Sequence, residues 1–359
     1  MVKGISPDVA GEILSALGSE ENFFRLTESD LQSIAMVSSR VFSAAYRNGL
    51  IEKAKREYDY LSGKGISACY FTDSNYPARF LTAADSPLLL YYIGNCDLNA
   101  KKIISIVGTR HASAYGMALC HDTVLSLKEK VGNDVVVVSG LAYGVDVSAH
   151  TAALEAGLPT VAVMAHGLDM IYPSQHRAIA AEIAKRGGAI VTEYASGTRI
   201  HRSNFLARNR IIAALSDCTL VVESATKGGA LVTANIASGY GRDVFAFPGR
   251  VGDEYSAGCN SLIKKNIASL VSGVDDIADS MQWERKAPVA VQQELFLDLD
   301  SDEQRIYDCL AGSDMVHISE LVGALKISVH SLLSSLVEME FKGLIHALPG
   351  NRYCLLRKL

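Results

Sequence analysis

The chain has 359 residues, of which 49% are hydrophobic and 20% are charged, with 29 glycines and 8 prolines. This is the balance of a globular protein with about two or three folding units, and it excludes a wholly disordered or collagen-like chain. The net charge is −5, and residues 101–285 carry 18 basic against 17 acidic side chains, which excludes a general cationic coat for duplex DNA.

No stretch reaches the ~18 uninterrupted apolar residues of a membrane-spanning helix, and the first residues lack the apolar block of a signal peptide. The 7 cysteines are scattered and include no C-x-x-C pair. Such spacing argues against a zinc ribbon or a disulfide scaffold and favours reduced thiols in the cytoplasm. No metal site and no membrane span are expected.

Residues 1–65 are expected to form a small helical module of the helix-hairpin or SAM-like kind. An amphipathic run covers 10–17, and Thr27-Glu-Ser-Asp30 is a capping signal for a further helix. Helical spacing of Lys and Glu then continues over 46–61. The acidic balance of this module favours a packing or partner surface over contact with DNA.

From residue 101 the sequence alternates short aliphatic runs with helical segments. Uninterrupted aliphatic runs are typical of strands that are buried on both faces. The expected strands are 103–107, 135–138, 160–164, 189–192, 219–222 and 244–247, and helices are expected at 117–129, 147–156, 174–185 and 230–238. This alternation predicts that 66–285 is an α/β domain, an extended Rossmann-like core with a mostly parallel sheet and helices on both faces.

The C-terminal part of the chain predicts a winged helix. Residues 286–300 lack periodicity and are interpreted as a linker, whereas 301–359 show three helical runs and then two strand-like runs around Pro349-Gly-Asn351. A winged helix that binds duplex DNA normally carries basic side chains on its third helix. Here that helix, 329–340, has no Lys or Arg, which favours a protein-interaction role.

The first candidate binding site follows the strand that ends at Val107. In open α/β sheets, ligands collect outside the carboxyl ends of the strands. Gly108 permits a tight turn there, and Arg110 supplies a forked cation beside the positive end of the next helix. Thr109 or Ser113 can add a hydroxyl. These residues predict an anion cradle, and the alternative is a turn with a solvent-exposed arginine.

The next strand ends at Ser139 and Gly140, which we include in the candidate site. Asp146 follows, and we interpret it as the cap of the helix that begins there. His150 lies among alanines in that helix. We interpret it as a buried, hydrogen-bonded histidine and not as a catalytic base.

A second cradle is predicted after the strand that ends at Val222. Lys227 precedes Gly228 and Gly229, which open a helix. The ammonium would then lie beside the first amides of that helix, and these groups together can hold a phosphate.

A segment rich in arginine lies at 199–210, with four arginines and one histidine and no acidic residue. It is either a solvated face or part of a binding groove, and the apolar Phe205 and Leu206 within it indicate partial packing. Two cradles and these arginines at one sheet edge suit an extended single strand of nucleic acid better than a compact nucleotide.

Signatures of catalysis are absent from the sequence. It contains no H-E-x-x-H, no G-x-S-x-G, no Walker motif and no carboxylates at metal-ligand spacing. We therefore expect a protein that is not an enzyme and that needs no cofactor.

The combined motifs resemble those of the DprA family, also called Smf, over nearly the whole chain. The resemblance implies a cytoplasmic bacterial protein that binds single-stranded DNA, loads the recombinase RecA onto it in natural transformation, and forms a homodimer through its Rossmann core without catalysis. The matching runs are Ile106-Val-Gly-Thr-Arg110, Ser139-Gly-Leu-Ala-Tyr-Gly-Val-Asp146, Gly167-Leu-Asp-Met-Ile-Tyr-Pro173, Phe205-Leu-Ala-Arg-Asn-Arg-Ile-Ile-Ala213, Gly229-Ala-Leu-Val-Thr-Ala234 and Phe247-Pro-Gly249.

The same resemblance implies the roles of individual residues. Gly108, Thr109 and Arg110 would hold one phosphate, and Lys227 with the turn Gly228-Gly229 would hold a second. The remaining residues that the resemblance adds to the groove are Asn209, Arg210 and Thr233.

Two rival hypotheses remain. Rossmann-like nucleotide phosphoribohydrolases have a related sheet, but their P-G-G-x-G-T turn is replaced here by Lys227-Gly-Gly-Ala-Leu-Val-Thr233, with no proline before it and no glutamate at the helix start. A purely architectural scaffold would not need this density of glycine and arginine at strand ends.

Overall fold

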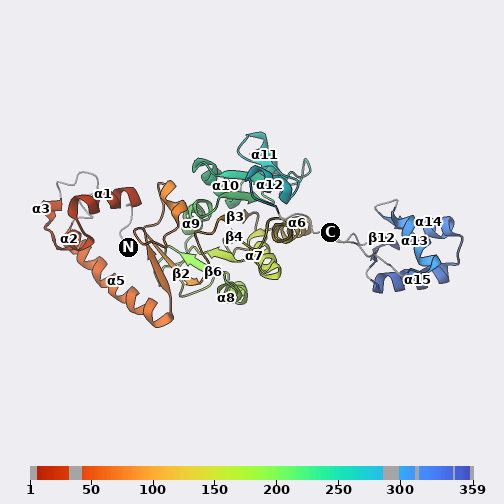
Figure 1. Ribbon diagram of the computed structural model, residues 1–359, viewed down its shortest axis with the longest axis horizontal. Coiled ribbons are helices and arrows are strands. Elements are labelled where there is room, and N and C mark those ends of the chain that lie inside the picture. Colours follow the sequence, from red (N-terminus) through yellow and green to blue (C-terminus); the bar gives the residue numbers. More distant parts are fainter. Residues whose placement is uncertain (1–5, 32–42, 286–298, 312–314, 343, 356–359) are drawn as a thin grey trace. The chain divides into compact units, whose positions relative to one another are not determined.

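The computed structural model of the chain divides into two compact units, Met1–Pro288 and Val289–Leu359, and each is considered by itself. The expected linker, 286–300, lies almost wholly outside the described residues. The structure describes residues 6–31, 43–285, 299–311, 315–342 and 344–355 (Figure 1).

The first unit begins with the helices α1 (Pro7–Leu17), α2 (Glu20–Arg25), α3 (Glu28–Leu31) and α5 (Ala44–Lys64). The capping signal ahead of α3 is confirmed, because the amide of Thr27 donates to Asp30 at 3.1 Å and the Thr27 hydroxyl accepts from the amide of Asp30 at 3.3 Å. Glu57 of α5 connects these helices to the rest of the first unit, because its carboxylate accepts from the amide and the hydroxyl of Ser196.

A nine-stranded sheet forms the centre of the first unit, and its order is β1-β2-β6-β5-β4-β3-β7-β8-β9. The pairs β1–β2 and β2–β6 are antiparallel and all the others are parallel. The six predicted strands are confirmed as β3 to β8, whereas the edge strands β1 and β9 and the strand β2, which lies between β1 and β6, were not predicted. The bounds are β1 (Ser67–Tyr70), β2 (Leu89–Gly94), β3 (Lys102–Val107), β4 (Val135–Ser139), β5 (Thr160–Val163), β6 (Ala189–Thr192), β7 (Cys218–Val221), β8 (Asp243–Ala246) and β9 (Ser269–Leu270).

Helices cover both faces of this sheet, as the alternation predicted (Figure 1). One face packs on α9 (Arg202–Leu215), α10 (Gly229–Gly239) and α11 (Ala257–Lys264). The other packs on α6 (Ala114–Ser126), α7 (Val145–Ala156), α8 (Arg177–Lys185) and α12 (Val274–Ser280). Shorter turns of helix lie at Ala78–Thr82, Leu127–Val131 and Ser174–His176.

The winding direction of the sheet reverses at β3. From β3 the chain proceeds through β4, β5 and β6, and α9 then returns it across the sheet to β7, which pairs with the other side of β3. In doubly wound sheets such a reversal leaves a crevice outside the carboxyl ends of the two strands at the switch point. The loops after Val107 and Val221 therefore meet there.

The second unit is a winged helix with its own apolar core, which includes Ile306, Leu321 and Leu336. The three predicted helices and the two predicted strands are confirmed, and the short strand β10 pairs with β12 to give the sheet order β10-β12-β11. The elements are α13 (Ser301–Ala311), β10 (Val316–His317), α14 (Ile318–Leu325), α15 (Val329–Phe341), β11 (Ile345–Leu348) and β12 (Arg352–Leu355).

No single helix in the described part of the chain is long and apolar enough to cross a membrane. Among these residues, only the pair α14 and α15, which is bent by 114°, reaches the length and apolar composition of a span when the two helices are taken together. Within the same residues, no group of three or more His, Cys, Asp or Glu side chains is arranged to hold a metal ion.

Candidate functional site

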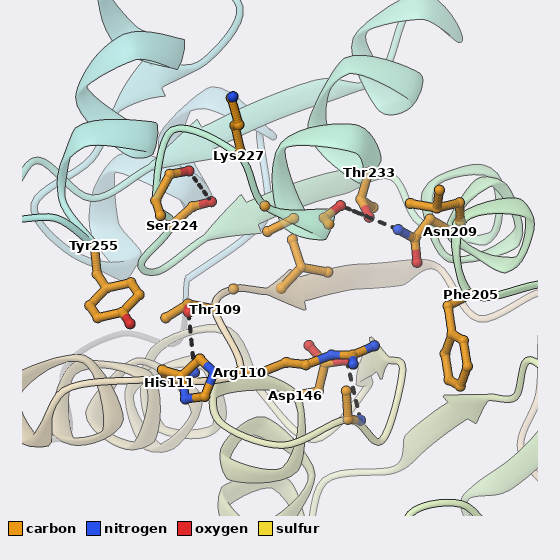
Figure 2. A pocket seen from close by; sticks show the side chains of 18 of the residues that line it. Thr109, Arg110, His111, Asp146, Phe205, Asn209, Ser224, Lys227, Thr233 and Tyr255 are labelled. Carbon is orange, nitrogen blue, oxygen red and sulfur yellow. Dashed lines mark hydrogen bonds between the residues drawn. The ribbon is translucent and has the colours of Figure 1, made fainter. Parts of the chain in front are cut away.

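A cavity of about 680 Å³ opens at the switch point between β3 and β7 (Figure 2). Its walls come from the loop after β3, the loop after β7, the start of α10 and one side of α9. The predicted site residues that line it are Gly108, Thr109, Arg110, Asn209, Lys227, Gly228, Gly229 and Thr233. The structure thus brings both predicted cradles and part of the arginine segment to one place.

The wall after β3 presents an exposed cation beside an aromatic ring. The Arg110 guanidinium lies 5.4 Å from the centre of the Phe205 ring, and its side chain extends toward that ring in Figure 2. The loop is held in place by the loop after β7, because the Thr109 amide donates to the Glu223 carbonyl at 2.8 Å. Gly108 is required there by packing, since a Cβ would lie 2.3 Å from a methyl group of Val145.

The wall after β7 ends in the N-terminus of α10. Gly228 is the N-cap of this helix and supplies no side-chain cap, so the first amides of α10 keep their capacity to bind an anion. Lys227, just ahead, is exposed, and its side chain extends away from Arg110 in Figure 2. The two cations therefore border the same cavity from opposite walls and do not converge on one point.

The N-terminus of α6 is already occupied by a carboxylate of the protein. Glu223 accepts from the Ser113 amide at 2.9 Å and from the Ser113 hydroxyl at 2.6 Å. Ser113 in turn caps α6 by accepting from the Gly116 amide at 3.0 Å. The amide and hydroxyl of Ser113 are thus already engaged by an internal anion, and a phosphate-binding role for this helix end stays a prediction.

The arginine segment 199–210 runs from the loop before α9 into that helix, and its arginines differ in burial and partners. Arg208 is buried and donates to the carbonyls of Gly140, at 2.8 Å, and of Val163, and burial lowers its pKa to about 10. Arg210 pairs with Glu193 instead of lining the cavity. Arg202 is the exposed arginine of this segment that reaches the lining.

The structure places the remaining predicted residues outside the cavity lining. The Ser139 hydroxyl is fully buried and donates to the Ile106 carbonyl at 2.7 Å, while the Gly140 carbonyl is bonded to Arg208. A ligand role for Ser113, Ser139, Gly140 or Arg210 stays a prediction, and each of these four has a partner within the fold.

Asp146 is not the cap of α7, contrary to expectation. Gly144 occupies the N-cap position, while Asp146 lies inside the first turn, buried at the floor of the cavity, and accepts from the Ala142 amide at 3.4 Å. Burial raises the pKa of this carboxyl, and the positive charges of Arg208 and Arg110 act in the opposite direction.

His150 is the buried, hydrogen-bonded histidine that the sequence predicted. Its Nδ1 lies 2.7 Å from the Thr160 hydroxyl, which itself donates to the Val137 carbonyl. The hydroxyl must therefore accept from Nδ1–H, which leaves Nε2 as the unprotonated nitrogen. Nε2 is buried and has no partner among the described residues, and burial lowers the pKa of His150 to about 3.

Other residues of the lining were not identified from the sequence. Tyr255 and His111 face each other across the mouth, with ring centres 6.5 Å apart, and Glu254 and Ser224 lie near them. Tyr255 follows β8 in an ordinary-looking polar loop, and the only available signal was that this loop also leaves a carboxyl end of the sheet.

The fold and this site define a Rossmann-like α/β protein with a cavity lined by Arg110 and Lys227 at the switch point of its sheet, joined to a winged helix. The family model of DNA recombination-mediator protein A matches residues 67–282, and that of the DprA winged helix domain matches 292–351. The chain belongs to the DprA family, whose members are also named Smf.

Relatives of known name support this membership. The chain is 37% identical over 283 residues to the putative DNA processing protein DprA of Mycobacterium tuberculosis. The matched region covers 76% of this chain and 70% of that protein. It is 35% identical over 292 residues to protein Smf of Escherichia coli, over 79% of this chain and 75% of that protein.

Two solved structures share the fold. DprA of Streptococcus pneumoniae aligns with a TM-score of 0.64 and 32% identity over 77% of this chain and 93% of that chain. DprA of Helicobacter pylori, whose structure is described as revealing a single-stranded DNA binding mode, aligns with a TM-score of 0.54 and 30% identity over 60% of this chain and 95% of that chain.

Proposed function

We propose that this protein binds single-stranded DNA along the crevice between β3 and β7 and loads RecA onto the bound strand, acting in the cytoplasm without catalysis. The observation that carries the first part is the cavity at the switch point, where Arg110 and Lys227 flank the uncapped start of α10. The single-stranded DNA described for the H. pylori relative supports the choice of ligand.

The physical chemistry of the lining favours a single strand over a duplex. Backbone amides and two separated cations can follow successive phosphates, and the half-buried rings of Phe205 and Tyr255 with the exposed His111 offer surfaces on which bases can stack. A base can stack on a protein ring only when it has left the base stack of a duplex, and an intact duplex would present mainly its backbone to the crevice.

The decisive experiment compares oligo-dT with a duplex of equal length in fluorescence anisotropy at several salt concentrations. We expect tight, salt-dependent binding of the single strand and clearly weaker binding of the duplex. Equal affinity for both would contradict the proposal.

RecA loading and a homodimer through the Rossmann core rest on family membership. RecA filament growth on single-stranded DNA coated with a single-strand binding protein should start sooner when this chain is added. Sedimentation of the chain at increasing concentration tests the dimer.

The rival function, hydrolysis of a nucleoside monophosphate, predicts release of the free base. The carboxylates in the lining, Asp146 and Glu254, are candidates for such chemistry, but Asp146 is buried beside Arg208. Chromatography of a nucleoside monophosphate incubated with the protein separates the two functions, because only a hydrolase produces free base.

A further inference from the structure

The third helix of the winged-helix unit carries an exposed apolar stripe that the domain core does not use. The residues of this stripe are Val329, Leu333, Val337 and Phe341, exposed by 51%, 40%, 51% and 90%. The core-facing side of α15 is formed by other residues, Leu332, Leu336 and Met339, which are fully or almost fully buried. The apolar arc of α15 is therefore much wider than the fold of this unit requires.

The spacing of the stripe suits packing against another helix. Its members recur every four residues, so they form a single oblique ridge along α15. Ridges of this kind interdigitate when two helices cross at about −50°, the commonest class of helix packing. An exposed row of four large apolar side chains is a typical mark of a protein interface.

The charges on α15 favour a protein partner over nucleic acid. The helix has no Lys or Arg within its bounds, and Glu338 and Glu340 lie close to its C-terminal end. Carboxylates there are unfavourable, because that end of a helix already carries partial negative charge. A phosphate backbone would add to this repulsion.

Within the chain, Glu340 accepts from the Ala347 amide at 3.0 Å and Lys342 follows at the C-cap, and a second copy of the same helix would stabilise Glu338 and Glu340 further. The stripe is symmetric about residue 335, so an antiparallel copy places Leu333 opposite Val337 and His330 opposite Glu340. The acidic end of each helix then lies beside the positive end of its partner, which stabilises both carboxylates. We propose that α15 is a homotypic docking surface, through which the winged helices of two chains pair antiparallel about residue 335.

This proposal concerns the winged helix and is independent of the DNA crevice. Four side chains per copy make a small interface, of the class below about 1,200 Å² that supports weak or transient association. Pairing through α15 would therefore add a second, weaker contact between chains to any contact made by the Rossmann core.

The test uses full-length protein and two variants, Leu333→Lys and Val337→Glu, whose sites are exposed and so should not disturb folding. In sedimentation velocity over a concentration series, each variant alone should associate at least about tenfold more weakly than the wild type, because a charge would be buried against an apolar side chain. Ser331→Lys, on the opposite side of α15, is the matched control and should behave as the wild type. Self-association of the Rossmann core is the same in all these proteins.

A mixture of the two variants tests the register. With one variant fluorescently labelled, the mixed pair should associate more tightly than either variant alone, because the introduced lysine of one chain would then face the introduced glutamate of the other. Single variants that sediment as the wild type would overturn the proposal. Weakened singles without recovery in the mixture would overturn it as well, since they would indicate a different occupant of the stripe.

Discussion

Glu223, just after the end of β7, places its carboxylate on Ser113, the N-cap of α6, with bonds of 2.9 Å to the amide and 2.6 Å to the hydroxyl. Residues 110 positions apart in the chain are thus joined across the switch point of the sheet. Of the two helix ends predicted to bind phosphate, one has its Ser113 donors engaged by Glu223, and the other, at α10, lacks a side-chain cap and lines the cavity.

Replacing Glu223 should therefore affect stability. Glu223→Gln keeps one acceptor and exchanges the other for a donor, so we expect the free energy of unfolding to fall by about 1 to 2 kcal/mol. Glu223→Ala should cost more, because both Ser113 donors lose their partner. Urea titration followed by circular dichroism measures both, and Glu52→Gln, in an exposed ion pair, is the control expected to change stability little. An unchanged midpoint in Glu223→Ala would contradict this account of α6.

Arg110 and Lys227 should contribute separately to DNA affinity. Each substitution to alanine removes one cation, so we expect weaker binding of oligo-dT and a salt dependence shallower by roughly 0.7 per lost phosphate contact. The effects should be nearly additive, because the two cations lie on opposite walls. Lys53→Ala, an exposed lysine on α5, provides a charge-matched control. Wild-type affinity and slope in both variants, with the fold intact, would remove the crevice assignment.

Phe205 should act by stacking. Its ring already contacts the Arg110 guanidinium and lies 5.8 Å from the ring centre of Tyr172. Phe205→Ala should weaken oligonucleotide binding by about 1 to 3 kcal/mol without changing the salt slope, whereas Phe205→Tyr should retain affinity. Anisotropy at two salt concentrations distinguishes this effect from loss of a phosphate contact, because only the latter changes the slope. Full affinity in the alanine variant would exclude stacking on this ring.

His150 should make the protein sensitive to acid. Its pKa is lowered to about 3 in the folded state, so below its ordinary value near 6.5 the unfolded chain binds a proton that the folded chain does not. The stabilising effect of neutral His150 is therefore complete above about pH 6.5 and is lost as the pH falls toward 3. Between pH 6.5 and 5, this effect should lower the free energy of unfolding by about 2 kcal/mol.

Urea unfolding at pH 7 and at pH 5 tests this prediction. The wild type should lose stability over this interval, and His150→Gln, which can still donate to Thr160, should lose about 2 kcal/mol less. Equal losses in the two proteins would show that His150 does not titrate on unfolding in this range.

The sequence was sufficient to predict the strands β3 to β8 and the winged helix. Buried aliphatic runs such as Val135–Ser139 can only be strands or buried helix segments, and their length decides between these. The edge strands β1 and β9 were not predicted because they are short and partly exposed; β9 has only two residues, both exposed.

The site was predictable where it depends on the backbone and unpredictable where it depends on distant side chains. Gly108 and Gly228 mark strand ends whatever surrounds them, so both loops were correctly brought to one edge. Nothing near Ser113 indicates that Glu223 will reach it, and nothing within α9 indicates that Arg208 faces inward while Arg202 faces the cavity. Such pairings are decided only when the complete sheet brings the segments together.

The switch point also determines when the crevice comes into existence. Its lining extends from Val107 to Tyr255, and β7 joins β3 only after three intervening strands have been made. A nascent chain that ends before residue 255 therefore lacks a wall of the crevice, however well its first strands have formed. If the crevice binds its ligand as proposed, a nascent chain gains that binding only after residue 255 has left the ribosome and β7 has paired with β3.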